Sequence, residues 1–209
     1  MRFLAVLIVL GCFPVFAQDQ NDVLQLIQVL AIQADSQQNQ GNYSESESSR
    51  RQLISVMERA GAPPPEIARQ LSNLASVLNL SGKPAEAQGL CERAQAILED
   101  NPTDDPVQEA VLLGNLAQAL RLQGDLEGAR SKFEQELLLL SNLGLDATHF
   151  AASAMVGIGA IDAESGNLVE AVARYEVALP IILGISDESH PTTARILEEY
   201  EEIKSALEE

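Results

Sequence analysis

Few side chains in this 209-residue sequence are of types that could do catalytic or metal chemistry, and they are widely spaced. The two histidines, His149 and His190, stand 41 residues apart. As a zinc pair they would need further ligands at a compatible spacing, and the sequence offers none. The alternative is that both are turn residues of a repeating unit, because 41 residues is close to the repeat period described below. We therefore expect no bound metal and no cofactor.

The familiar catalytic motifs do not occur in the sequence. It has no Gly-x-Ser-x-Gly, no His-Glu-x-x-His and no phosphate-binding loop. The stretch GIGAID at 157–162 imitates part of a dinucleotide fingerprint, but no strand precedes it. The thiol of Cys91 has two interpretations. It is either an inert buried group or a reactive thiol, which would need exposure and a nearby cation. We expect a protein that is not an enzyme.

Asp162 is an ionisable residue at a position where the repeats described below carry Leu78 and Leu120. A buried lone carboxylate is costly, so this side chain should be either solvated or paired. One interpretation is a loose, solvated interface near the C-terminal end. The other is a polar bond to Arg174 or to Tyr200, both of which the repeat register places nearby.

Residues 1–17, MRFLAVLIVLGCFPVFA, are predicted to be a secretory signal peptide. The apolar run Phe3–Phe13 is shorter than the roughly 20 residues that a membrane span needs. Small residues, Val15 and Ala17, precede the predicted cleavage point, so the protein is expected to be exported and to be periplasmic or secreted. Two alternatives remain open: lipid attachment at Cys12, in the weak lipobox VLGC, and an uncleaved anchor.

The composition restricts the partners. The formal net charge is −18, and the densest basic stretch is Arg50-Arg51. A phosphate backbone repels such a chain, and the absence of tryptophan removes the best stacking platform for bases. Nucleic-acid binding is therefore not expected. Nothing beyond the leader is apolar enough to span a membrane.

Glycines recur along the chain at spacings of 41, 42 and 42 residues: Gly41, Gly82, Gly124 and Gly166. Five residues after each stands a small residue: Ser46, Ala87, Ala129 or Ala171. A period near forty residues indicates a solenoid of stacked units. We expect the three alanines to be fully buried where two helices of a unit cross.

Each unit is predicted to be a pair of helices. In one unit, apolar residues at helical spacing form a first stripe: Ile67, Leu71, Leu74, Ala75 and Leu78. Gly82 then ends the first helix, and Pro84 fits the first turn of the second. The second stripe consists of Ala87, Leu90, Cys91, Ala94, Ile97 and Leu98. A single pair cannot bury both stripes, so the pairs must stack on one another.

The sequences LSNLASVLNLSGKPAEAQGLCERAQAIL and LGNLAQALRLQGDLEGARSKFEQELLLL resemble tetratricopeptide repeats. The 42-residue period is similar to the kinesin-light-chain subtype, well over 66–209 and poorly over 22–60. The resemblance implies an all-α superhelix of about four helix pairs plus a C-terminal capping helix. The expected parts are a degenerate N-terminal repeat or cap at 18–62, repeats at about 66–101, 106–143 and 148–185, and a capping helix at 190–208. The outer face of that cap is expected to carry Glu198, Glu199, Glu201 and Glu202.

In this family the first helix of each unit lines a concave groove, where an asparagine nine residues before the repeat glycine often clamps a peptide backbone. The resemblance places Asn73 and Asn115 at that position, and Gly157 in the next repeat. The implied groove residues are Arg69, Asn73, Ser76, Asn79, Asn115, Gln118 and Arg121. Two arginines in one groove would favour a carboxylate or an acidic stretch of the partner. The polar clamp should end before the fourth repeat, which offers Val156, Gly157 and Ala160. The alternative is that all these are ordinary solvated side chains.

The sequence thus predicts an exported scaffold that binds a peptide or protein partner in its concave groove. The alternative is a structural or assembly subunit of the cell envelope that uses its end surfaces. The sequence does not identify the partner.

Overall fold

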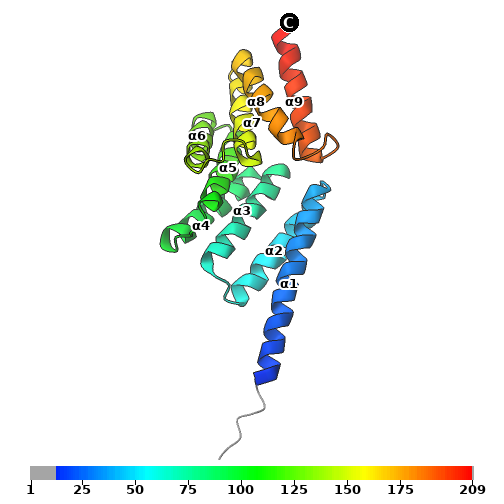
Figure 1. Ribbon diagram of the computed structural model, residues 1–209, viewed down its shortest axis with the longest axis vertical. Helices are drawn as coiled ribbons and strands as arrows, with labels where there is room; N and C mark the ends of the chain where they lie inside the picture. The colour runs from blue at the N-terminus through cyan, green and yellow to red at the C-terminus, as the bar shows by residue number, and fades with distance from the viewer. Residues whose placement is uncertain (1–12, 209) are drawn as a thin grey trace, which may run out of the picture.

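The structure is a computed structural model that describes residues 13–208, with side chains from residue 20 onward. These residues form nine α-helices and no strand, arranged as a curved stack of antiparallel pairs (Figure 1). The bounds are α1 Phe13–Asn39, α2 Tyr43–Arg59, α3 Pro64–Leu80, α4 Pro84–Asp100, α5 Pro106–Leu122, α6 Leu126–Asn142, α7 His149–Glu164, α8 Leu168–Leu183 and α9 Pro191–Glu208. The predicted solenoid of four helix pairs and a capping helix is confirmed.

The leader that the sequence predicts falls mostly outside the described residues. Cys12 lies there, and Phe13 to Ala17 belong to the first turns of α1. Cleavage after Ala17 therefore stays a prediction. Among the described residues, no helix is long and apolar enough to cross a bilayer.

Local chemistry at the turns explains where the helices begin and end. Gly82, Gly124 and Gly166 have φ of +73°, +86° and +82°, the left-handed conformation that ends a helix at little cost for glycine alone. Asp125 caps α6, because its carboxylate accepts a hydrogen bond from the Gly128 amide at 3.0 Å. The same turn thus closes three successive helix pairs.

The predicted crossing points are confirmed. Ala87, Ala129 and Ala171 are fully buried between the paired helices. Ser46 occupies the same place between α1 and α2 and is also fully buried, with its hydroxyl donating to the Ala34 carbonyl at 2.8 Å. The N-terminal pair therefore has the same close crossing, made by a hydrogen-bonded serine instead of an alanine.

The N-terminal pair is held largely by polar contacts, which explains its polar sequence. Its apolar cluster has only Leu30, Leu53 and Met57 as buried members. The buried Arg50 guanidinium on α2 donates to Asp35 at 2.7 Å and to Gln38 at 2.8 Å on α1. The sequence resemblance is weak over this pair because polar bonds replace much of the apolar packing.

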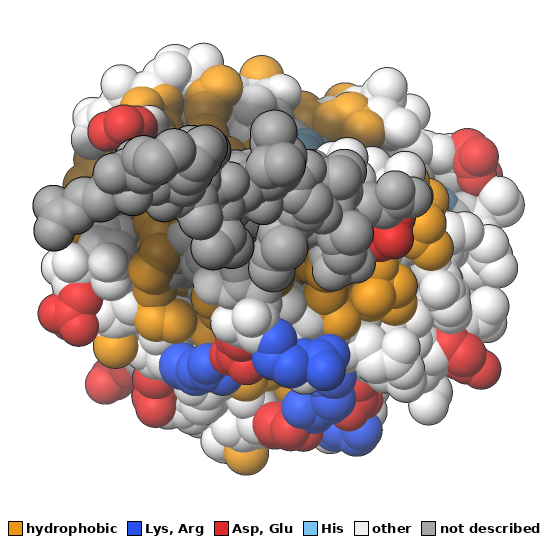
Figure 2. All heavy atoms as spheres, turned by 90° about the horizontal axis from the view of Figure 1, so that it is seen from below, with side chains coloured by type: hydrophobic (Ala, Val, Ile, Leu, Met, Phe, Trp, Pro, Cys, Tyr) orange, Lys and Arg blue, Asp and Glu red, His pale blue; other side chains and the backbone are white. Residues whose placement is uncertain are grey.

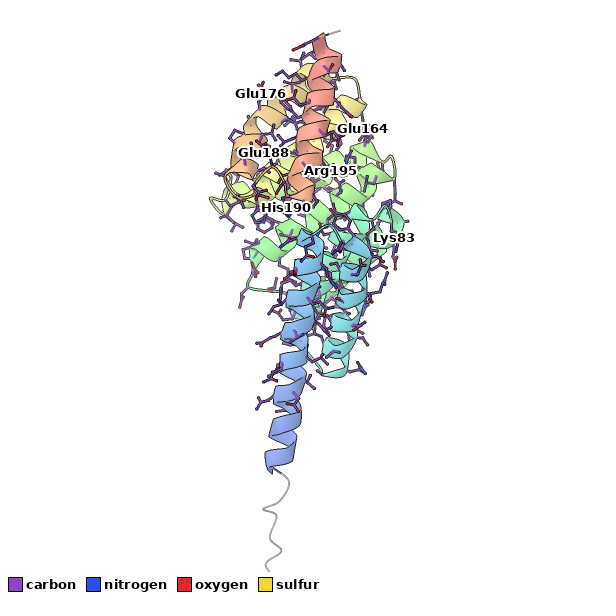
Figure 3. The ribbon with its side chains drawn as sticks, turned by 90° about the vertical axis from the view of Figure 1, so that its right-hand side faces the viewer. Lys83, Glu164, Glu176, Glu188, His190 and Arg195 are labelled. Atoms are coloured by element: carbon purple, nitrogen blue, oxygen red, sulfur yellow. The ribbon has the colours of Figure 1, made fainter. Side chains whose placement is uncertain are left out.

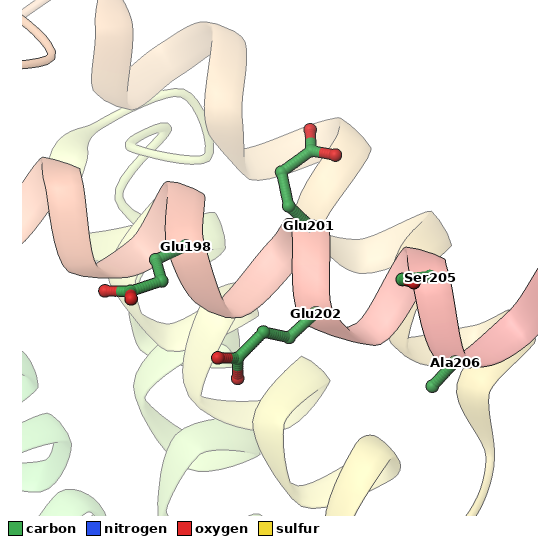
Figure 4. A pocket seen from close by; sticks show the side chains of 5 residues that line it. All are labelled: Glu198, Glu201, Glu202, Ser205 and Ala206. Atoms are coloured by element: carbon green, nitrogen blue, oxygen red, sulfur yellow. The ribbon is translucent and has the colours of Figure 1, made fainter.

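Helix α9 caps the stack by packing on α8, with Ile196 and Ile203 buried. Three of the four glutamates expected on its outer face are exposed, and Glu198, Glu201 and Glu202 line a shallow hollow there (Figure 4). Glu199 is a correction: it is half-buried, and its carboxylate lies 3.5 Å from Arg195. At 100° per residue, Glu199 follows Arg195 and Ile196 onto the inner side of the helix.

Candidate functional site

A central groove of about 770 Å³ runs along the concave side of the stack. Its walls are the first helices α3, α5 and α7, with the C-terminal end of α1 and the start of α9 at its rim. The two ends of the solenoid meet here, because a Cβ added to Gly41 would lie 3.4 Å from Cγ of Pro191. His190 and Arg195 lie near the base of α9, where that helix approaches the end of α1 (Figure 3). The curvature of the superhelix thus brings both ends to one site.

Six of the seven residues expected in the groove line it: Asn73, Ser76, Asn79, Asn115, Gln118 and Arg121. Arg69 is the exception and is not among the lining residues. It lies in the exposed early part of α3, where the Glu66 carboxylate, three residues earlier, holds its guanidinium at 2.5 Å. The expectation that Arg69 shares the groove with Arg121 is therefore wrong.

Two of the asparagines bond to neighbouring helices instead of facing the groove freely. The Asn115 amide on α5 donates to the carbonyl and the hydroxyl of Ser72 on α3, at 3.0 and 2.9 Å. The Asn79 amide donates to the Asn115 carbonyl at 2.9 Å. These bonds join α3 to α5, so both asparagines help to set the shape of the groove. The half-buried Asn73 and Ser76 make no side-chain hydrogen bond to any described residue.

Arg121 contributes less free charge to the groove than its type suggests. Its guanidinium forms an ion pair with Glu164 at the end of α7 and donates to Gln118 on its own helix at 3.4 Å. The side chain is largely buried, and the carboxylate of Glu164 compensates its positive charge. The guanidinium therefore links α5 to α7.

The α7 wall is apolar, with Val156, Gly157 and Ala160 lining it. Gly157 is required by packing, because a Cβ there would overlap the ring of Phe133, which reaches the groove from α6. Phe150 adds a second ring to this wall. The α7 part of the groove is thus richer in apolar side chains than the α3 and α5 parts.

The histidines lie in different surroundings. His149 begins α7 and lines the groove, with its ring centroid 3.7 Å from that of Phe150, and burial lowers its pKa below the ordinary value. His190 precedes α9, where its Nδ1 accepts from the Thr192 amide at 3.3 Å. Among the residues searched, no group of three or more histidine, cysteine or carboxylate side chains could hold a metal ion.

Glu136 is a groove residue that sequence analysis missed. It comes from the second helix α6, is 3% exposed, and its Oε2 has no hydrogen-bond partner. Burial raises the pKa of this carboxyl group to about 9. Its carboxylate occupies the space that a side chain at Gly114 of α5 would fill, since a Cβ there would lie 2.5 Å from Oε2.

The repeat register could have revealed Glu136. Ala94 and Ala178 stand 42 residues before and after it, and both are fully buried. A glutamate between two buried alanines, facing a glycine on the neighbouring helix, is a departure that the period exposes. It was missed because second helices were not expected to reach the groove.

Asp162 and Cys91 lie outside the residues that line the groove. The Asp162 carboxylate accepts from Arg174 at 2.7 Å, as predicted, and from Arg130 at 2.6 Å, which was not predicted. Tyr200 is wrong as a partner, because its hydroxyl donates to Glu176 at 3.4 Å. Cys91 is fully buried and burial raises the pKa of its thiol to about 12, which favours the inert interpretation.

Comparison with known proteins defines the class. The family model for the tetratricopeptide repeat matches residues 66–137, from α3 into α6. This segment therefore consists of tetratricopeptide repeats, and the fold of the described chain is that of a tetratricopeptide-repeat solenoid.

Solved structures with this fold include kinesin-light-chain-like proteins. BtubC (BKLC) from P. vanneervenii has a TM-score of 0.62 at 18% identity, over 93% of this chain and 86% of that one. A putative kinesin light chain with nearly identical TPR-like repeats, from Podosopora anserina, has a TM-score of 0.58 at 18% identity, over 90% and 87%. The apo form of RapI has 0.57 at 15%, over 88% and 50%. At these identities the likeness concerns the fold alone. No curated protein matches the sequence significantly.

Proposed function

We propose that this chain is a protein-interaction scaffold that binds an extended peptide segment of a partner in the central groove. The observation that carries the proposal is one continuous groove formed by the first helices of three consecutive repeats. Its volume of about 770 Å³ lies within the range of ligand-binding pockets, roughly 300–1,000 Å³. A segment a few residues long fits that space.

The two walls suit the two parts of a peptide. Asn73, Ser76 and Gln118 are half-buried polar side chains that can both donate to and accept from a peptide bond. The α7 wall, with Phe150 and Val156, offers apolar surface for side chains of the bound segment. Hydrogen bonds to the peptide backbone recognise a segment regardless of its sequence, and apolar contacts with its side chains add selectivity.

Export of the protein is part of the proposal. The apolar run Phe3–Phe13, followed by Val15 and Ala17, supports a leader that is removed, with a mature chain beginning near Gln18. The intact mass of the exported protein tests this directly. A lipid on Cys12 would instead support the anchored form, and an unprocessed chain would contradict cleavage.

The groove is tested by peptide selection on the immobilised protein. A display library of random dodecapeptides is selected on the wild type, and the enriched peptides are tested again on Ser76→Tyr, which fills the groove without removing a hydrogen bond. The control, Ala96→Tyr, adds the same ring to the exposed side of α4. Binding that Ser76→Tyr abolishes and Ala96→Tyr preserves is the expected result. Equal retention by both variants would refute the groove as the binding surface.

The second candidate function, an assembly subunit that uses its end surfaces, is favoured by α1. Leu24, Val29 and Ile32 are 59%, 58% and 70% exposed, and apolar side chains are visible on the N-terminal end of the molecule (Figure 2). Exposed apolar surface of this kind suits a second copy of the chain. Sedimentation of the wild type and of Val29→Lys/Ile32→Lys tests it: a dimer that the double substitution dissociates supports this function, and a monomeric wild type contradicts it.

A further inference from the structure

We propose that the central groove selects a lysine or arginine side chain of the bound segment, whose cationic head pairs with Glu136 beside the ring of Phe133. This inference rests on the proposed peptide-binding function and names the chemistry of the partner.

The first observation is the state of the Glu136 carboxyl group. It lines the groove, is 97% buried, and its Oε2 has no hydrogen-bond partner. Buried polar atoms are almost always bonded, so an orphan in a groove wall calls for an explanation. A cation in the groove would pair with this carboxyl group once the side chain turns toward it, because Oε2 itself is fully buried.

The second observation concerns how the carboxyl group reaches the groove. The side chain starts on α6, behind the first helices, and passes α5 only because Gly114 has no Cβ. The neighbouring repeats carry alanine in place of Glu136, namely Ala94 and Ala178, and serine or valine at the register of Gly114, namely Ser72 and Val156. The glutamate on the second helix and the glycine on the first helix thus occur together in one repeat.

The third observation is the ring beside the acid. Phe133 lies three residues before Glu136, so both side chains leave the same face of α6, and both line the groove. The ring reaches the groove through Gly157 of α7 in the same manner. A carboxylate next to an aromatic ring suits an ammonium or guanidinium group. The carboxylate attracts the cation by its charge, and the ring attracts it by its quadrupole.

The charges of the groove favour a cation over an anion. Arginines among its lining residues already have carboxylate partners: Arg50 with Asp35 at 2.7 Å, Arg121 with Glu164, and Arg195 with Glu199 at 3.5 Å. Glu136 has no such partner. The whole chain carries a formal net charge of −18, so its field attracts basic segments and repels acidic ones. An acidic partner, the expectation that Arg69 and Arg121 suggested, is disfavoured.

Burial raises the pKa of Glu136 to about 9, so the carboxyl group is neutral in the empty groove at pH 7. A cation that enters must draw it into the ionised form, with release of a proton to solvent. The charge-assisted bond formed in a site that excludes water offsets this cost. A neutral side chain of the same length gains no such bond.

The test uses two small probes and the full chain. N-acetyl-lysine methylamide carries the side-chain ammonium without a free amino terminus, and N-acetyl-norleucine methylamide is its neutral counterpart. Each is titrated by NMR into wild type, Glu136→Gln and the control Glu198→Gln, which makes the same change on the exposed side of α9. We expect wild type and the control to bind the lysine probe at least ~10-fold more tightly than the norleucine probe. Glu136→Gln should lose the preference.

Equal affinity of the wild type for the two probes, or a preference that Glu136→Gln retains, would overturn the inference. A second outcome is a preference for the lysine probe that depends on Glu136, together with selected peptides that still bind Ser76→Tyr. It would support the cation site and contradict the peptide-binding groove. If Ser76→Tyr abolishes peptide binding but the wild type shows no preference for the lysine probe, the peptide-binding groove is supported and the cation site is contradicted.

Discussion

Two carboxylates on adjacent helices of this molecule are buried in contrasting ways. Asp162 on α7 is 4% exposed and accepts from two arginines, whereas Glu136 on α6 is 3% exposed and its Oε2 has no partner. Burying a charge is costly unless it is paired. At Asp162 the chain itself supplies two arginine partners, and these ion pairs join α6, α7 and α8. At Glu136 it supplies none, and the group faces the groove.

The contrast separates a structural charge from one that is available to a ligand. Arg130 and Arg174, the partners of Asp162, have side chains that are 30% and 40% exposed, so this cluster lies at the surface of the seam between helices. Glu136 lies in a hollow that has room for another molecule. The same substitution, acid to amide, should therefore have opposite effects at the two positions.

The largest expected effect is stabilisation by Glu136→Gln. The amide resembles the neutral acid but has no proton to lose in the unfolded chain. Because the pKa is raised from 4.5 to about 9, we expect a gain in unfolding free energy of roughly 3–4 kcal/mol at pH 7, at about 1.4 kcal/mol for each pH unit above 4.5. Urea unfolding measures it. A destabilised variant would show that the carboxylate is ionised and paired in solution.

The pH dependence follows from the same shift. Between pH 4.5 and about 9 the folded state holds a proton on Glu136 that the unfolded chain has lost, so wild-type stability falls as pH rises. The advantage of Glu136→Gln should vanish near pH 4 and grow toward pH 9. Other ionisable side chains line the groove: Asp35, Tyr43, Arg50, Arg121, His149, Arg195 and Glu199. His149 has a lowered pKa, so the range above pH 7 isolates Glu136 from it. A constant difference across pH would contradict the raised pKa.

Both carboxylates depend on α6, which carries Glu136 and the Arg130 partner of Asp162, and Ala129 sets how closely that helix packs. Ala129 is fully buried in a cluster with Phe133 and Ile158. Ala129→Leu should overpack this crossing and cost roughly 1–3 kcal/mol of unfolding free energy. An unchanged melting temperature would show that the crossing has room to spare. Ala96→Leu, on the exposed side of α4, is the control and should change little.

Asp162→Asn should act in the direction opposite to Glu136→Gln. It removes the charge that two guanidinium groups share, and we expect a loss of roughly 1–2 kcal/mol, limited because both arginines reach solvent. A double-mutant cycle with Arg174→Gln isolates the pair. Coupling below about 0.3 kcal/mol would mean that Asp162 and Arg174 act independently.

The sequence predicted the fold because its signal is repeated. The period of the glycines and of Ala87, Ala129 and Ala171 fixed the helix pairs, since each copy must present the same surface to the next. Asp162 and its bond to Arg174 were found as a departure from that period. The register therefore predicts what recurs, and at Asp162 it also revealed an interruption.

The groove was predicted less completely because its chemistry depends on contacts between helices. The period places Asn115 on a first helix but does not show that its amide is bonded to Ser72. It places Arg121 correctly but does not show its pair with Glu164. Glu136 reaches the groove only because Gly114 is missing a side chain. The period marks both residues as departures but does not show that they face each other between two helices.

The smallest expected effect concerns Gly114 itself. Alanine in place of a mid-helix glycine stabilises by roughly 0.5–1 kcal/mol when there is space for it. At Gly89 in α4 nothing lies within 4 Å of an added Cβ, so Gly89→Ala should show the full gain. At Gly114 the added Cβ would lie 2.5 Å from Oε2 of Glu136, so the acid must move away from the groove and most of the gain should be lost.

The Glu136→Ala variant provides a second background in which to compare Gly114→Ala with Gly89→Ala. Glu136→Ala restores the residue found at Ala94 and Ala178, and it removes the three atoms that lie nearest to the added methyl group. Gly114→Ala should then recover the roughly 0.5–1 kcal/mol that Gly89→Ala gives. Urea unfolding of the four chains in this cycle measures the coupling between the two positions. If Gly114→Ala and Gly89→Ala stabilise the wild type equally, Glu136 does not pass through that position, and the acid does not reach the groove in the way described.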